Sequence, residues 1–200
     1  MGRFLLAIFV ALLAACAGPA KKPPEITPHS WAEHAAAVAA LEAWTAQGKL
    51  ALRTSQYVEA ARMEWRQQGR HSTIQLSGPA GLNATLIEHD GRRLAISSGD
   101  EQHVWDVSSP DALARETGWE LPLNALPHWL KGVPAPGSDI QLLELDEDEA
   151  LLQHLRQNDW EVRYEDYGAF APYTLPTRLR IQRGTTSARV IIRDWQFPES

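Results

Sequence analysis

The sequence predicts a mainly β protein with helices, an α+β fold in which a single antiparallel sheet curls around an apolar interior. The 200 residues show no internal repeat and no change of composition that would mark a second folded domain. Apolar and polar residues alternate in roughly ten short runs, which is the period of a half-buried strand. Glycine-containing turns separate these runs at short intervals and favour hairpins, and therefore antiparallel pairing. A sheet of so many strands usually curls.

Residues 1–15 have the pattern of a cleaved signal peptide. Arg3 precedes an apolar run that is too short to span a bilayer and ends in small residues. Cys16, the single cysteine of the chain, follows Leu-Ala-Ala directly, and this arrangement resembles a bacterial lipoprotein signal. The resemblance implies cleavage before Cys16 and acylation of its sulfur. It also implies an outer-membrane address, since Ala17 is not the aspartate that retains lipoproteins in the inner membrane. The alternative is a plain signal peptide with an incidental cysteine.

Residues 16–30 are predicted to be the lipidated cysteine and a tether. This segment lacks apolar periodicity and is rich in proline, at Pro19, Pro23, Pro24 and Pro28. Its contour length of roughly 45 Å would hold a folded domain clear of lipid headgroups. Two or three acyl chains make a stable anchor where a single chain is marginal. We therefore expect residues 31–200 to form one folded domain tied to a membrane.

The folded domain is predicted to begin with a helix over residues 31–45. Ser30 can cap this helix and Glu33 lies three residues on, which is the spacing of a capping box. Apolar residues then recur at helical spacing, at Trp31, Ala35, Val38, Leu41 and Trp44. After Gly48 the period changes to two, which indicates the first strand.

The strands are predicted from this period of two. In the first strand Leu50 and Leu52 face one way, whereas Lys49, Ala51 and Arg53 face the other. Later runs of the same kind cover residues 62–66, 71–76, 82–87, 93–97, 103–107, 140–144, 151–157, 160–164, 177–182 and 188–195.

A helical insertion is predicted between the two groups of strands, over residues 109–132. Ser109-Pro110-Asp111 opens it, and Gly132 and Pro134 stop it. Its apolar residues lie on roughly one helical stripe, at Leu121, Leu123, Leu126, Trp129 and Leu130.

Tryptophan is unusually frequent. The chain has eight Trp against four Tyr and four Phe, and loss of residues 1–15 removes two of the Phe. A large ring with one N–H suits a wall between an apolar space and water. Tryptophan is also ordinary core filler, so composition leaves the interior as either an open cavity or a solid core.

No pattern in the sequence supports an enzyme, a cofactor or a metal site. The chain has no Gly-x-Ser-x-Gly turn, no pair of histidines at helical metal spacing and no phosphate-cradling glycine loop. The acidic run at residues 146–149 lacks the glycine and the alternating oxygens of a calcium loop. One cysteine excludes a disulfide framework. The net charge of -6 argues against a nucleic-acid partner.

Several segments of the mature chain match a known family. The first are Trp31, the strand around residues 48–52, Trp65 and Gly78-Pro79-Ala80-Gly81. The next are Gly118-Trp119, Leu121-Pro122, Leu126, Trp129-Leu130 and Gly132-Val133-Pro134. The last are Trp160-Glu161-Val162-Arg163-Tyr164, Leu175-Pro176 and Trp195. Together with the lipoprotein signal, they resemble the outer-membrane lipoprotein receptor LolB family over nearly the whole mature chain.

The resemblance implies an incomplete antiparallel barrel, lidded by helices, whose apolar cavity holds the acyl chains of a lipoprotein. It implies that this cargo comes from the periplasmic carrier LolA and enters the outer membrane without a nucleotide. The expected form is a lipid-anchored monomer that faces the periplasm. The alternative is a structural outer-membrane lipoprotein that scaffolds an envelope assembly machine.

For the acyl-chain cavity we predict the apolar residues of the inward strand phase, together with three residues of the helical insertion. They are Leu50, Leu52, Met63, Trp65, Ile74, Leu76, Leu94, Ile96, Trp105, Leu126, Trp129 and Leu130. A slip of one residue in the phase of a strand would invert its whole set.

The resemblance also implies a membrane-delivery loop at Pro79, Ala80, Gly81 and Leu82. The family carries an exposed leucine between a proline and a glycine, and this leucine is implicated in delivery to the membrane. Ala80 stands at that position here. Leu82 either supplies the apolar tip or begins the next strand and faces inward.

Overall fold

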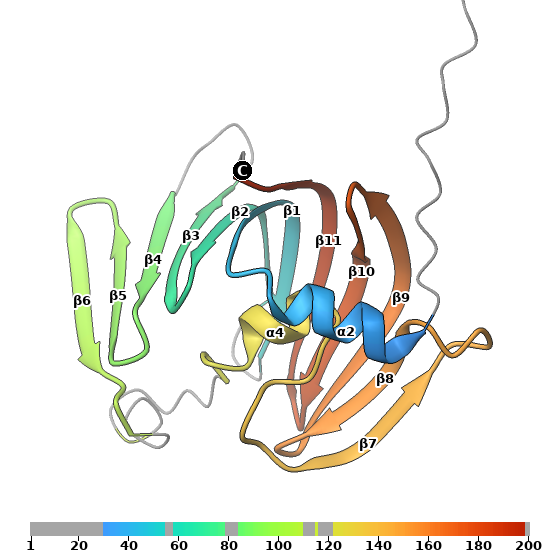
Figure 1. Cartoon of the computed structure of the whole chain (residues 1–200). Coiled ribbons are helices and arrows are strands. Elements are labelled where there is room, and N and C mark those ends of the chain that lie inside the picture. The colour runs from blue at the N-terminus through green and yellow to red at the C-terminus, as the bar shows by residue number, and fades with distance from the viewer. Residues whose placement is uncertain (1–29, 55–57, 79–83, 110–114, 116–121, 199–200) are drawn as a thin grey trace, which may run out of the picture.

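A computed structural model describes residues 30–54, 58–78, 84–109, 115 and 122–198. In these ranges eleven strands form one antiparallel sheet in the order β6-β5-β4-β3-β2-β1-β11-β10-β9-β8-β7 (Figure 1). The strands are β1 (Ala43–Arg53), β2 (Val58–Gln68), β3 (His71–Ser77), β4 (Thr85–His89), β5 (Arg93–Ser98), β6 (Glu101–Asp106), β7 (Ile140–Leu145), β8 (Leu152–Gln157), β9 (Trp160–Phe170), β10 (Tyr173–Arg183) and β11 (Thr186–Gln196). Each predicted run overlaps one of them, which confirms the mainly β fold.

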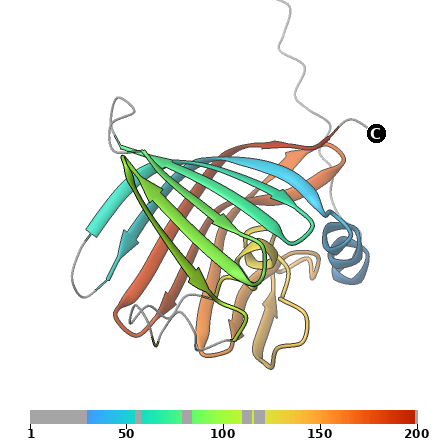
Figure 2. The same cartoon turned by 90° about the vertical axis from the view of Figure 1, so that its left-hand side faces the viewer.

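The sheet curls but does not close. β2 to β6 form one meander and β7 to β11 form another, while β1 joins them by pairing with β2 and with β11. β6 and β7 are the two ends of the strand order, and neither pairs with a further strand among the described residues. Figures 1 and 2 show the sheet curving around the two helices from β1 across β11 to β7, while β4 to β6 extend away from them. The expected incomplete barrel is therefore confirmed.

The first helix, α2 (Trp31–Ala39), is shorter than predicted. Ser30 caps it as expected, and its hydroxyl accepts a hydrogen bond of 3.3 Å from the Glu33 N–H. The prediction that the helix continues to residue 45 is wrong, because β1 begins at Ala43. Trp44 lies on that strand, with ring-centroid distances of 5.9 Å to Trp65 and 5.1 Å to Trp195. Burial of this ring inside the sheet outweighs the local helical pattern.

The second helix, α4 (Leu126–Leu130), lies within the predicted insertion, but residues 122–125 before it are a turn and not the helix that the sequence predicts. Gly132 ends it as predicted, with a φ of 84° that favours glycine. Residues 110–114 and 116–121 of the insertion lie outside the described ranges. Across the described ranges, no helix has the length and apolar character needed to span a bilayer.

The space between α4 and the strands β8 to β11 is a packed core. The rings of Trp129 and Trp160 are both buried, with their centroids 6.3 Å apart. The Tyr164 hydroxyl donates a hydrogen bond of 2.9 Å to the carbonyl of Trp129. The tryptophan content left open whether the interior is an open cavity or a solid core. Between α4 and these strands it is a solid core.

Candidate functional site

The register of the hairpins places the predicted inward residues on one face of the sheet. Directly opposed residues of antiparallel strands share a face. Trp65 lies opposite Ile74, Ile74 lies opposite Ile87, and Ile87 lies opposite Ile96. An apolar row therefore crosses the inner face from β2 to β5, in the phase that the sequence predicts.

The predicted cavity residues fall into groups by burial. Buried in the main core are Met63, Trp65, Trp129 and Leu130, and partly buried against that core are Leu50, Ile74, Leu76 and Leu126. A second apolar cluster contains Leu94, Ile96 and Trp105. Leu52 is half-buried on β1. Contact of these residues with acyl chains stays a prediction.

Two further predicted sites cannot be placed in the structure. Cys16 and the loop at Pro79, Ala80, Gly81 and Leu82 lie outside the described residues.

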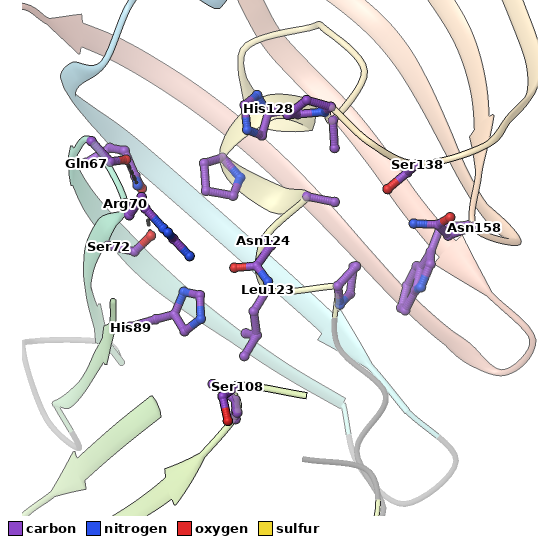
Figure 3. Close-up of a pocket in the computed structure, with 18 of the residues that line it drawn as sticks. Gln67, Arg70, Ser72, His89, Ser108, Leu123, Asn124, His128, Ser138 and Asn158 are labelled. Atoms are coloured by element: carbon purple, nitrogen blue, oxygen red, sulfur yellow. Dashed lines mark hydrogen bonds between the residues drawn. The ribbon is translucent and has the colours of Figure 1, made fainter. Parts of the chain in front are cut away.

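A cavity of about 830 Å³ opens between the two meanders of the sheet. One wall comes from the turn between β2 and β3, with Arg70, and from His89 at the end of β4 (Figure 3). The opposite wall includes Asn124 and His128 from α4 and the segment before it, and Asn158 from the turn between β8 and β9. The lining includes none of the predicted cavity residues.

A signal for this cavity was present in the sequence and was missed. Gln67, Ser72 and His89 all lie in the inward phase, because Gln67 is opposite Ser72 and Ser72 is opposite His89. All three are buried polar residues. Polar side chains that interrupt the apolar side of consecutive strands point to a polar site within the curl.

Gln67 organises the polar wall of the cavity. Its Oε1 accepts hydrogen bonds from Trp65 Nε1 at 3.0 Å and from Ser72 Oγ at 2.7 Å. Its Nε2 donates to the carbonyl of Gly69 at 2.9 Å. Both ends of the amide are therefore satisfied, and the network holds the turn between β2 and β3 in place.

His89 has a free nitrogen at this wall. Its side chain is 7% exposed, and its Nε2 has no hydrogen-bond partner. Figure 3 shows the ring directed into the cavity. Burial lowers the pKa of His89, and the opposing effect of the Asp90 carboxylate is smaller, so the ring is neutral at pH 7.

The opposite wall is held by Gln157, which is fully buried. Its Oε1 accepts hydrogen bonds from Trp129 Nε1 at 2.8 Å and from the Ala135 N–H at 2.9 Å. Its Nε2 donates to the carbonyl of Ala135 at 2.8 Å. Trp160 lines the cavity beside this network, with the Arg183 guanidinium 4.9 Å from its ring centroid.

Lys131 ties the two helices together inside the sheet. It directly follows α4, is 4% exposed, and donates from Nζ to the carbonyls of Val38 at 3.0 Å and Leu41 at 2.7 Å. Val38 lies in the last turn of α2 and Leu41 just follows the end of that helix, where the negative end of the helix dipole favours a cation. The contact fixes α2 against α4 over the core.

Among the described residues that line the cavity, several carry hydrogen-bond donors and none carries a carboxylate. Its described lining contains Arg70, Arg183, His89 and His128 but neither Asp nor Glu. No group of three or more potential metal-ligating His, Cys, Asp or Glu side chains gathers in the described part of the chain. The arrangement can bind acceptor oxygens beside an apolar face, and it lacks the paired acid and base of a hydrolytic site.

Comparisons with known proteins agree on one family. A family model described as "Outer membrane lipoprotein LolB" matches residues 42–195. A protein named outer-membrane lipoprotein LolB from Alkalilimnicola ehrlichii is 38% identical over 203 residues, covering 98% of each chain. A protein of the same name from Chromohalobacter salexigens is 33% identical, covering 95% of this chain and 88% of the relative.

A solved structure supports the fold independently. The LolA superfamily protein from Nitrosomonas europaea superposes with a TM-score of 0.54, covering 88% of this chain and 96% of that one. At 11% sequence identity this similarity concerns the fold alone.

Proposed function

The chain belongs to the outer membrane lipoprotein LolB family, and on this premise we propose that it accepts lipoproteins from the periplasmic carrier LolA and inserts them into the outer membrane. Membership of the family makes it an outer-membrane lipoprotein receptor and not an enzyme. Our proposal adds three points: the cargo comes from LolA, this protein inserts it into the outer membrane, and no nucleotide is needed.

The observation that carries the proposal is the apolar row on the inner face of an open sheet. Ile74 and Leu76 pack against the core but are only partly buried, so apolar surface remains inside the curl. Moving one methylene from water to such a surface releases about 0.8 kcal/mol. Moving the same methylene from one apolar site to another changes its free energy little. A modest difference in affinity between the two proteins can therefore drive transfer without a nucleotide.

The proposal extends to the N-terminal segment. Residues 1–15 serve as the signal peptide, Cys16 carries the acyl anchor, and residues 16–30 form the tether to a domain over residues 31–200. The domain acts as a monomer on the periplasmic side of the outer membrane. Supporting this arrangement, the matched relatives are named outer-membrane lipoproteins.

Reconstituted transfer tests the proposal. LolA loaded with a labelled lipoprotein is mixed with phospholipid vesicles and this protein lacking Cys16, without nucleotide. We expect the label to leave LolA only when this protein is present. Leu76→Glu places a charge on the inner face and should abolish acceptance, whereas the control Gln75→Glu adds the same charge at an exposed neighbouring position. If the label stayed on LolA with the unmodified domain, a structural scaffold would become the better account.

A further inference from the structure

We propose that the cavity between the two meanders binds the polar head of the acylated cargo, the glyceryl diester and the adjoining amide, while the acyl chains extend along the inner face of the sheet. This inference rests on the proposed function, since it presumes an acylated cargo. It assigns a second part of the site, with a chemistry different from that of the apolar row.

The positively charged and N–H-bearing side chains that line the cavity favour ligands with hydrogen-bond acceptor oxygens. The chain as a whole has 25 Asp and Glu against 19 Lys and Arg, yet the described lining of the cavity holds arginine and histidine and no carboxylate. Arg70 and Asn124 are exposed at its rim, and both side chains carry N–H donors. Ester and amide carbonyls, which accept hydrogen bonds and donate few or none, are the groups that such a surface fits.

His89 supplies a hydrogen-bonding position inside the cavity, since the Nε2 of a neutral imidazole donates in one of its two tautomers. A buried polar atom that has no partner within the protein is available to a group of a bound ligand. The Nε2 of His89 is such an atom, and it faces the cavity (Figure 3). Beside it, Gly91 lets Arg70 lie close to the turn, because a Cβ there would come within 2.8 Å of the guanidinium. Arg70 and His89 therefore approach the cavity from neighbouring turns.

The cavity continues into apolar surface, as a site for an amphiphile requires. Val107 and Leu123 line it and belong to the second apolar cluster, together with Leu94. Along β4, Ile87 lies two residues from His89 on the same face, a separation of about 7 Å. A ligand whose head contacts His89 would place its first methylenes against this apolar row.

The size of the cavity is consistent with a head group rather than a complete cargo. Its volume of about 830 Å³ falls within the range of small-molecule sites, about 300–1,000 Å³. A glyceryl diester with its first methylenes fits within this volume, whereas full-length acyl chains need the inner face as well.

The test compares two lipopeptides with identical chains, one with ester-linked chains and one with ether-linked chains that lack the carbonyl oxygens. Binding is measured by quenching of tryptophan fluorescence with the protein lacking Cys16. Each lost hydrogen bond costs about fivefold in affinity. The ether lacks two carbonyl oxygens, so we expect the unmodified domain to bind the ester about 25-fold more tightly than the ether.

Variants locate the effect in the cavity. Arg70→Gln and Asn124→Ala change exposed rim residues, and His89→Phe keeps the size of a buried ring while it removes Nε2. In each the ester preference should fall to about fivefold, with unchanged thermal unfolding for the two rim variants. The matched control Arg66→Gln changes an exposed arginine on the outer face of β2, the strand that leads into the turn of Arg70, and should keep the full preference.

Equal affinity for ester and ether in the unmodified domain would overturn the inference and leave the proposed function intact, because the acyl chains still bind. Absence of binding for both lipopeptides would defeat the proposed function as well. A diester phospholipid and its diether analogue form a third comparison. An ester preference for the phospholipid alone would assign the cavity to a membrane lipid and overturn its assignment to the cargo.

Discussion

Lys131→Met probes the contact that holds α2 inside the curled sheet. The ammonium of Lys131 is buried and donates to the carbonyls of Val38 and Leu41. Burial lowers the pKa of Lys131 from 10.5 to about 8, against a weaker opposing effect of Glu42. In the unfolded chain the side chain returns to water and its pKa returns to the ordinary value.

The sign of the effect follows from proton binding. Between pH 8 and 10.5 the unfolded chain holds a proton on Lys131 that the folded chain has released. A state that binds more protons is disfavoured as pH rises, so this group makes the folded state relatively more stable across that window. From pH 7.5 to pH 9.5 the gain amounts to about 2 kcal/mol, as obtained from the two pKa values.

The assay is urea unfolding of the unmodified domain and the Lys131→Met variant at half-unit steps from pH 7.5 to 9.5. The quantity of interest is the difference between their free energies of unfolding, since burial also raises the pKa values of Tyr164 and Tyr167 and both proteins share that effect. We expect the difference to move in favour of the unmodified domain by about 2 kcal/mol. A difference that stays constant with pH would refute the argument from burial.

Four further changes have defined outcomes. Gln157→Leu leaves buried partners unpaired and should lower the free energy of unfolding by about 3 kcal/mol in urea titrations. In Gly48→Ala the new Cβ would overlap the Ile191 carbonyl at the bulge between β1 and β11, so we expect a thermal midpoint lower by about 10 °C or failure to fold. Cys16→Ser should move the protein from the membrane to the soluble periplasmic fraction, and an unchanged distribution would disprove the anchor. Leu82→Glu should slow insertion of cargo into vesicles without affecting its removal from LolA, and insertion at the unmodified rate would exclude a delivery role for this residue.

The strands and their inward phase could be predicted from the sequence because each depends on neighbouring residues. Met63 and Trp65 alternate with charged residues on β2, and this alternation alone identifies the face that turns inward. The end of the first helix could not be predicted in this way. Trp44 continues the helical spacing, but its ring is packed against Trp195, which lies far away in the sequence.

The second apolar cluster was predicted in part. Leu94, Ile96 and Trp105 were chosen by strand phase and do lie together, although they pack apart from the main core. The phase of a strand does not reveal how far a meander bends from the rest of the sheet. Figure 1 shows that β4 to β6 diverge from the helices, and this bend separates the two clusters.

The predictions of a signal peptide and of an anchor at Cys16 rest on local composition alone, and the apolar inner face follows from a local period of two. A segment displays its composition and period whatever its fold. The cavity and the Lys131 contact arise only in the tertiary structure. Arg70 and Asn158 lie on turns of different meanders, and the open curl brings these turns to one cavity. The two turns lie close together only because strands pair across the sheet, above all β1 with β11. No short stretch of residues encodes such a pairing.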